Sequence, residues 1–140
     1  METTWIIVAS REDVRIFSRQ GHGHIQLERE IGNPSGRLKL QDLVSDRSGA
    51  SSDNRMRRRP AYATEESPRE RAVKDFYREV CEELDKALSK HRFNHLVFIA
   101  EPRLLGYLRG MLSKNLAQSV TREIAKDLSA EKQWDIEGRL

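Results

Sequence analysis

The sequence predicts a single α/β domain in which a three-stranded meander is followed by a long helix and a strand–helix unit. Three short strand patterns follow one another between residues 3 and 31, and a capped amphipathic helix begins after Ser67. A buried-strand pattern at residues 95–100 then runs directly into a helix that starts at a proline. The 140 residues correspond to one domain, which can bury enough surface to fold without a metal or a disulfide.

The three strand patterns occupy the first 31 residues. Residues 3–10 are rich in β-branched and aromatic side chains, which is typical of a strand buried on both faces. A second strand is expected at residues 14–17, after a polar break, and Gly21 and Gly23 suit the hairpin that follows. Residues 25–31 alternate between apolar and polar, which predicts a half-exposed third strand and an antiparallel meander.

The segment between the third strand and Ser67 carries little apolar character. Glycine and proline at residues 32–36 break the strand, and residues 38–44 suit either a short helix or an irregular segment. From residue 45 to 67, Ser, Gly, Asp, Arg and Pro dominate, so little can be buried to offset the entropy cost of ordering. We expect a mobile Arg/Ser-rich loop at 45–67.

The long helix has two start signals and one apolar stripe. Ser67 and Glu70 form a capping box around Pro68, which is preferred at the first helical position. Apolar residues then recur every three or four positions from Val73 to Leu88, which predicts a helix from Pro68 to about residue 90.

The last third of the chain continues the α/β pattern. A helix with apolar positions from Leu104 to Leu112 should follow the strand at 95–100. Residues 113–128 fit either a helical stripe or a strand that begins near Val120, and both alternatives remain open. A short polar helix is expected in the last dozen residues.

Five short motifs occur in one order along nearly the whole chain. They are Trp-Ile-Ile-Val-Ala at 5–9, Arg-Ile-Phe at 15–17, Asp-Leu-Val-Ser-Asp-Arg at 42–47, Ala-Glu-Pro-Arg-Leu-Leu-Gly at 100–106 with Arg109, and Glu-Ile-Ala-Lys-Asp-Leu at 123–128. Together they resemble the bacterial proteins required for attachment to host cells, a family similar to the middle domain of archaeal and eukaryotic release factors and pelota. The resemblance implies a mixed sheet of about five strands, including one around residues 120–125.

The sequence departs from the release factors at the position that matters for catalysis. In release factors, the loop before the long helix carries a Gly-Gly-Gln tripeptide that reaches the peptidyl-tRNA ester. Residues 54–60 here read Asn-Arg-Met-Arg-Arg-Arg-Pro, without a Gly-Gly pair or a glutamine. We therefore expect a non-enzymatic protein with no catalytic residues of this kind.

The arginines of this stretch are the densest charge cluster in a chain whose net charge is only +3. Arg55, Arg57, Arg58 and Arg59, with Arg47 nearby, can pair with phosphate oxygens and thus contact RNA. The alternative is a solvated linker whose arginines only keep the chain soluble.

A second candidate set surrounds the expected carboxyl end of the strand at 95–100, where α/β folds usually bind ligands. A possible cleft there comprises Asp46, Arg103, Arg109, Glu123 and Lys126. Ion pairs that hold a helix to the sheet explain the same charges more simply, and we favour that interpretation.

Metal and nucleophile chemistry have weak support. Asp42, Asp46 and Asp127 suggest a metal-dependent hydrolase, but each also reads as an ordinary turn or surface residue. The histidine pairs at 22 and 24 and at 91 and 95 bring no third ligand for zinc, and Cys81 has no evident base partner. We expect no metal and no cofactor.

The leading function hypothesis is a release-factor-like module that contacts the ribosome or RNA through the arginines. The alternative is a protein-interaction factor in host-cell attachment, and a metal-dependent hydrolase is third. No run approaches the about 20 apolar residues of a membrane span, and a single cysteine suits a reducing compartment, so a cytoplasmic protein is expected. The family resemblance implies that it is bacterial. The oligomeric state stays open.

Overall fold

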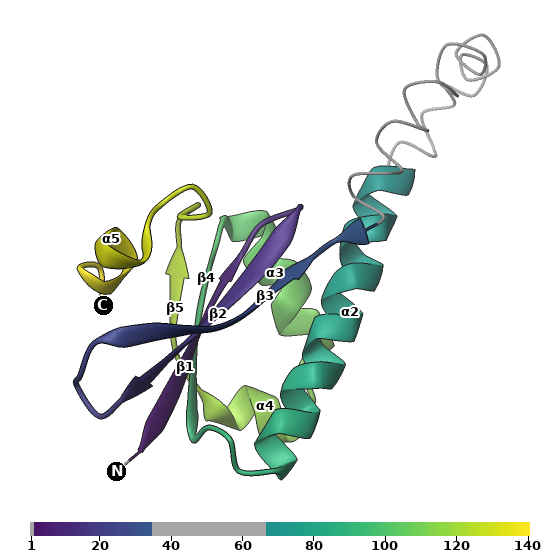
Figure 1. Ribbon diagram of the computed structural model, residues 1–140. Helices are drawn as coiled ribbons and strands as arrows, with labels where there is room; N and C mark the ends of the chain where they lie inside the picture. The colour runs from purple at the N-terminus through teal and green to yellow at the C-terminus, as the bar shows by residue number, and fades with distance from the viewer. Residues whose placement is uncertain (1, 35–66) are drawn as a thin grey trace, which may run out of the picture.

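A computed structural model describes residues 2–34 and 67–140 and confirms the mixed α/β fold (Figure 1). Its five strands form one sheet in the order β3-β2-β1-β4-β5. The described residues leave out 35–66, so the predictions for residues 38–44, for the loop at 45–67 and for Asp42, Asp46, Arg47 and Arg55–Arg59 lie outside them.

The antiparallel meander predicted at the N-terminus is confirmed. β1 (Thr3–Ala9) pairs with β2 (Asp13–Gln20), which in turn pairs with β3 (Ile25–Gly32). The last four residues of β1 are buried, as expected for a strand covered on both faces. β2 begins one residue earlier than predicted and extends three residues further.

The expected alternation of β3 is wrong over most of its length. Ile25 is buried, Leu27 is half exposed and Ile31 belongs to the opposite core. The cause is a break in register between Ile16 and Phe17 of β2, opposite Glu28, so that Glu28 and Arg29 point to the same side of the sheet. A single extra residue therefore moves the apolar position of the strand from one face to the other.

The carboxyl-terminal half adds two parallel strands. β4 (His95–Ala100) pairs with β1, and β5 (Val120–Ala125) pairs with β4. Between them lie α3 (Pro102–Met111) and α4 (Lys114–Ser119). The structure thus places a helix and a strand in succession at 113–128, and Leu116 is the buried residue of α4.

The long helix is α2 (Pro68–Ser89), and its start is the predicted one. The Ser67 hydroxyl accepts a hydrogen bond from the Glu70 amide at 3.1 Å, with Pro68 at the first position. The helix buries one stripe, formed by Val73, Phe76, Tyr77, Val80, Cys81 and Leu84. It ends where His91 takes a positive φ of 57°, a conformation that glycine more often adopts after a helix.

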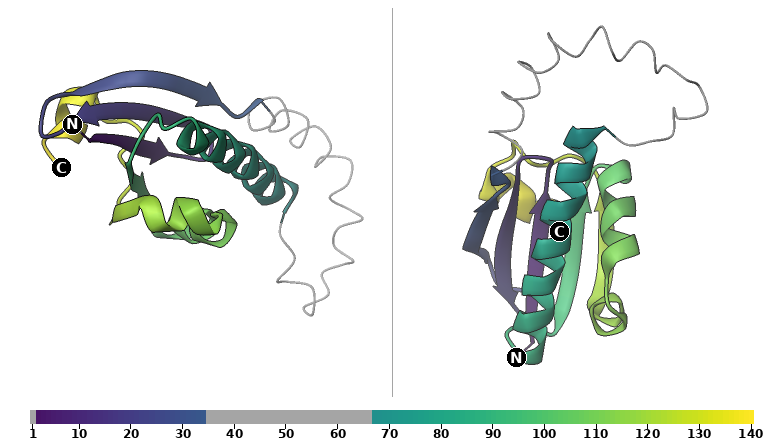
Figure 2. Two further views of the ribbon diagram at one scale, coloured as in Figure 1. Left: turned by 90° about the horizontal axis from the view of Figure 1, so that it is seen from below. Right: turned by 90° about the vertical axis from the view of Figure 1, so that its right-hand side faces the viewer.

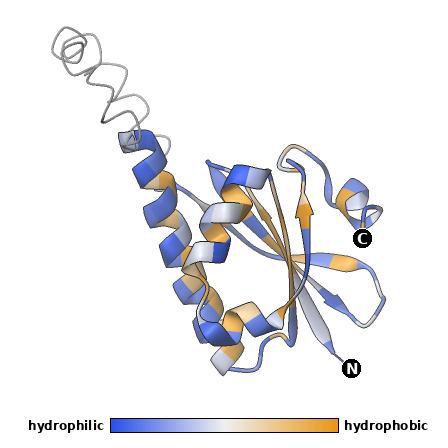
Figure 3. Ribbon diagram, turned by 180° about the vertical axis from the view of Figure 1, so that it is seen from behind, coloured by the Kyte–Doolittle hydropathy of each residue, from blue (hydrophilic) through white to orange (hydrophobic). Residues whose placement is uncertain are grey.

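Two cores lie on opposite faces of the sheet. Helices α2, α3 and α4 cover one face, as Figure 2 shows, and their apolar side chains meet Ile7, Ile16 and Phe98 there. On the other face, Leu128 and Ile136 of the C-terminal segment pack on Ile6, Val8, Phe17, Val97 and Ile99. The short helix α5 (Gln133–Glu137) is part of this cover, so the short polar helix expected there is confirmed. Hydrophilic residues dominate the outer side of α2 (Figure 3).

Among the described residues, no helix is long and apolar enough to cross a membrane.

Candidate functional site

One edge of the sheet gathers the ends of the segment that carries the arginines. Strands β1, β3 and β4 run in the same direction, so their carboxyl ends meet at this edge. Pro34 follows β3, and Ser67 precedes α2, so both flanks of residues 35–66 are fixed by elements of this part of the fold (Figure 1). Such edges are where α/β folds usually place their binding residues.

The turn between β1 and β2 forms the centre of this edge. The Ser10 hydroxyl accepts hydrogen bonds from the amides of Glu12 (3.2 Å) and Asp13 (3.1 Å), and the Ser10 amide donates to the Asp13 carbonyl at 2.8 Å. Asn33 donates its amide to the Glu12 carbonyl (2.8 Å) and its side-chain Nδ2 to the Arg11 carbonyl (3.2 Å). The turn therefore holds the residue that directly precedes Pro34.

Arg11 joins this turn to two helices. Its Nη1 forms an ion pair with Glu70 of α2, and its Nη2 lies 3.7 Å from Oε1 of Glu101, the residue before α3. The Tyr107 hydroxyl of α3 donates to the same Glu70 carboxylate. This bond, followed by partial burial, raises the pKa of Tyr107 above its usual value. Glu70 thus connects α2 to the β1–β2 turn through Arg11 and to α3 through Tyr107.

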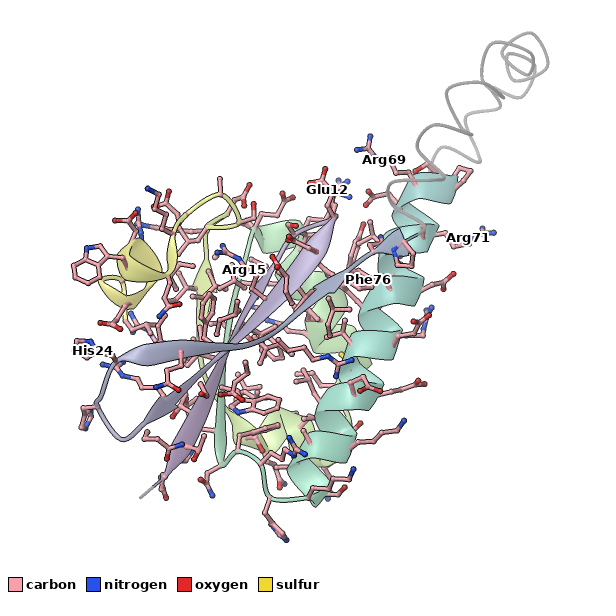
Figure 4. All side chains as sticks on the ribbon, viewed as in Figure 1. Glu12, Arg15, His24, Arg69, Arg71 and Phe76 are labelled. Carbon is pink, nitrogen blue, oxygen red and sulfur yellow. The ribbon has the colours of Figure 1, made fainter. Side chains whose placement is uncertain are left out.

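Several cations lie near the contacts that Glu70 makes with Arg11 and Tyr107. Arg69 and Arg71 occupy the first turn of α2 and point away from the ribbon in Figure 4, and Arg103 occupies the first turn of α3; all three are exposed. The Lys74 amine lies 4.8 Å from the centre of the Tyr107 ring. The surface therefore presents exposed cations beside the exposed carboxylate of Glu12, whereas Glu70 and Glu101 face Arg11.

Of the predicted cleft residues, the structure describes Arg103, Arg109, Glu123 and Lys126, which it places at three positions. Arg103 lies at the edge described above. Arg109 and Glu123 form an ion pair between α3 and β5, with 2.7 Å between Nε and Oε1, which raises the pKa of Arg109. Lys126 follows β5 and is exposed. The pair between Arg109 and Glu123 has the form expected of an ion pair that holds a helix to the sheet.

The weaker candidates have other partners in the structure. Asp127 accepts hydrogen bonds from the Ser129 hydroxyl and amide, which lower its pKa. His24 pairs with Glu137 at 2.7 Å, and His95 pairs with Glu2. Burial raises the pKa of the Cys81 thiol to about 11. In residues 2–34 and 67–140 no group of three His, Cys, Asp or Glu side chains is placed to hold a metal ion.

The sequence reasoning missed the residues that build this edge, above all Arg11, Asn33, Glu70 and Tyr107. Arg11 and Glu70 lie 59 positions apart, so no local spacing connects them. One signal was available: Arg11 directly follows a buried strand, in the position where strand ends meet. Because β1 and β4 are parallel, the residues after β1 lie at the same edge as those after the strand at 95–100.

Comparison with known proteins relates the whole chain to one family and one fold. The family described as "Protein required for attachment to host cells" matches residues 5–140. An uncharacterized protein of Rickettsia prowazekii (strain Madrid E), RP470, is 40% identical over 57 residues, which cover 39% of this chain and 38% of that protein.

Among solved structures, a crystal structure of the archaeal translation termination factor aRF1 superposes over 98% of this chain and 37% of its own, with a TM-score of 0.51 and 14% identity. A second structure, titled "Archaeal protein", gives a TM-score of 0.48 at 14% identity over 98% of this chain and 35% of its own. The chain thus spans about a third of the length of these solved chains. The likeness to aRF1 shows a shared fold.

Proposed function

The chain belongs to the family of proteins required for attachment to host cells, and from this premise we propose that it is a non-enzymatic, release-factor-like module that contacts RNA, free or in the ribosome. The contacting group is the arginine set Arg55, Arg57, Arg58 and Arg59, assisted by Arg47. The observation that carries the proposal is the concentration of four arginines within five positions of a chain with a net charge of +3.

The position of these arginines in the chain supports the proposal. They lie in the segment whose flanks, Pro34 and Ser67, belong to the edge described above. Arg69, Arg71 and Arg103 are exposed at the same edge, so phosphate groups that reach the segment meet further positive charge there.

A non-catalytic role is supported by the chemistry of the same edge. Residues 54–60 lack the Gly-Gly-Gln tripeptide with which release factors hydrolyse peptidyl-tRNA. Two carboxylates of the edge, Glu70 and Glu101, face Arg11, and Glu70 also accepts the Tyr107 hydroxyl. Oxygens that already accept hydrogen bonds or ion pairs from neighbouring side chains are not free to take a proton from a substrate, which does not suit a general base.

One observation favours protein interaction as the second candidate. Trp134 is 78% exposed and Leu27 is 50% exposed, and they are the large apolar side chains most open to solvent in the described parts of the chain. They lie on α5 and β3, two elements that contact each other. Exposed aromatic and aliphatic groups of this kind are typical of protein contacts. This surface would serve a protein partner in host-cell attachment.

The deciding experiment is RNA binding by a variant in which Arg55, Arg57, Arg58 and Arg59 are all replaced by Ser. Fluorescence anisotropy of a labelled single-stranded RNA at low salt should show affinity reduced by on the order of tenfold or more. A control with four other exposed cations replaced by Ser removes the same charge; these are Arg78, Lys114, Lys132 and Arg139. The control should bind far better than the arginine variant. Equal affinities of the two variants would overturn the proposal, and a Trp134→Ala variant would then test the protein-interaction surface.

A further inference from the structure

A polar hollow lies beside the last turns of α2, at the opposite end of this helix from Ser67 and Arg69. It has a volume of about 270 Å³, is open to solvent on one side, and is bordered by the last turns of α2, the first part of β1 and the middle of β2 and β3. Trp5, Ile16 and Leu84 form its apolar wall. The start of β1 is held there by Thr3, whose amide donates to Oδ1 of Asn94 and whose carbonyl accepts from the Asn94 amide, both at 2.8 Å.

Trp5 is held in place from one side. Its ring centre lies 4.9 Å from that of Phe93, with 36° between the ring planes, and Phe93 is buried. Trp5 itself is only partly buried and lines the hollow. An aromatic ring that is fixed by the core and open to a pocket is a stacking platform for a flat ligand.

The rim of the hollow is positive. Four cations line it, Arg29, Lys86, Lys90 and Arg92, against two carboxylates, Glu28 and Glu83, which leaves a net charge of +2.

The carboxylates of the rim already have partners. Glu83 accepts from Arg29 at 3.1 Å and lies 3.6 Å from the Lys86 amine; these contacts, the bond from Arg29 first, lower its pKa. Glu28 accepts the Ser18 hydroxyl at 2.8 Å. Within the described residues, Lys90 and Arg92 have no ion-pair partner.

The helix dipole accounts for only part of this arrangement. Cations just after a helix stabilise its partial negative end, which explains why Lys90 and Arg92 follow α2. It does not explain why Arg29 of β3 and the aromatic ring of Trp5 line the same hollow. The combination of a flat apolar wall with a positive rim matches a ligand that has an aromatic base and a phosphate.

We propose that this hollow binds one nucleotide unit, with its base against Trp5 and its phosphate between Lys90 and Arg92. The volume lies near the lower limit of about 300 Å³ for ligand pockets, which suits a single nucleotide. Its lining residues on α2 belong to the last turns of that helix, whereas Ser67 and Arg69 lie at its start, about 33 Å away along the 22 residues of α2. The ligand is therefore a nucleoside monophosphate group, either free or within a single RNA strand.

Tryptophan fluorescence tests the site directly. The chain has two tryptophans, and replacing the exposed Trp134 by Phe leaves Trp5 as the only one. Adenosine 5′-monophosphate should quench Trp5 in a saturable way, whereas inorganic phosphate should not quench it, and adenosine should require higher concentrations. In the same background, Lys90→Ser with Arg92→Ser should weaken the affinity for the nucleotide at least tenfold. Lys114→Ser with Lys132→Ser removes the same charge elsewhere and should leave the affinity unchanged.

The two sources of the ligand are separated in the variant that lacks the four arginines. If an oligoadenylate binds this variant more tightly than the mononucleotide does, the site takes an RNA strand, and equal affinities indicate a free nucleotide. The quenching by the mononucleotide should be the same with and without the arginines, so failure of the RNA proposal leaves this site standing. Absence of saturable quenching, or equal affinity in the two double-serine variants, would overturn the inference.

Discussion

The Tyr77 hydroxyl, in the middle of α2, donates a hydrogen bond of 2.7 Å to the backbone carbonyl of Ser10, the first residue after β1. Tyr77 is fully buried, so this bond joins the long helix to the end of the strand inside the core. Ser10 also organises the turn that carries Arg11. The bond therefore ties α2 to the edge of the sheet at which the arginine segment begins and ends.

Replacing Tyr77 by Phe should destabilise the fold by about 1–3 kcal/mol, because the Ser10 carbonyl loses its buried donor. Urea unfolding followed by circular dichroism measures the change. A Tyr77→Phe variant as stable as the parent protein would show that the Ser10 carbonyl finds another donor.

Tyr77 also makes the stability of the fold depend on pH in alkaline solution. Burial is the main cause that raises the pKa of Tyr77 above its usual value of 10, so the folded state keeps the hydroxyl protonated. The unfolded chain loses this proton above about pH 10, and stability therefore falls as pH rises beyond that value. The pKa of Cys81 is raised in the same direction. Tyr77→Phe should make the alkaline loss of stability shallower, and an unchanged slope would contradict this.

Phe76, on the buried stripe of α2, is the second test of the packing. It is 4% exposed, and its neighbour Tyr77 lies with its ring centre 5.8 Å away. Phe76→Ala should lower the free energy of unfolding by about 3–5 kcal/mol. A loss of less than about 1 kcal/mol would mean that this face of the helix is not the packed one. Arg78→Ala, on the exposed face, is the matched control.

Arg15 holds the C-terminal segment on the second core. Its Nη1 donates to the Glu131 carbonyl at 2.9 Å, and its Nη2 donates to the carbonyls of Leu128 and Ser129, both at 3.0 Å. A lysine cannot reproduce this planar fork, so Arg15→Lys should cost about 1.5–3 kcal/mol. Hydrogen exchange should accelerate at Leu128 and Ile136 in particular. If exchange there stays unchanged, another contact holds the segment.

The elements with local signals were predictable. The start of α2 was predicted from three residues within four positions, Ser67, Pro68 and Glu70, and the Ser67 side chain caps the helix as expected. The strand at 95–100 has the predicted bounds because its apolar run is bounded by polar residues and a proline. The position of β5 was harder to predict from the sequence. Its residues suit a helix as well as a strand, and pairing with β4 decides between them.

The features set by distant partners were not predictable. The extra residue at Glu28 of β3 leaves no mark in the alternating pattern, and Glu28 and Arg29 find their partners on β2 and α2. The same is true of Arg11, whose partner Glu70 is brought near only by the folded chain. The cluster of arginines at 55–59 is evident from the sequence alone. Arg69 and Arg71 could be assigned to the edge of the sheet only once the structure had shown where α2 begins.

The protein should not hydrolyse peptidyl-tRNA, because the stretch before α2 lacks the Gly-Gly-Gln tripeptide. Single-turnover release of a labelled peptide from stalled ribosomes measures this activity. The rate with the protein should equal the rate without it. Release above that background, abolished by changes at residues 54–60, would show that another group in this stretch performs the reaction.

The central claim, that the arginine stretch binds RNA through phosphates, is tested most directly by the salt dependence of RNA affinity. Each phosphate neutralised on a single strand contributes a log–log slope of roughly −0.7, so engagement of most of the four arginines predicts a slope of about −2 to −3. The variant with Ser at positions 55, 57, 58 and 59 should show a much flatter slope and the same thermal unfolding as the parent protein. Equal slopes for the parent protein and this variant would contradict the account.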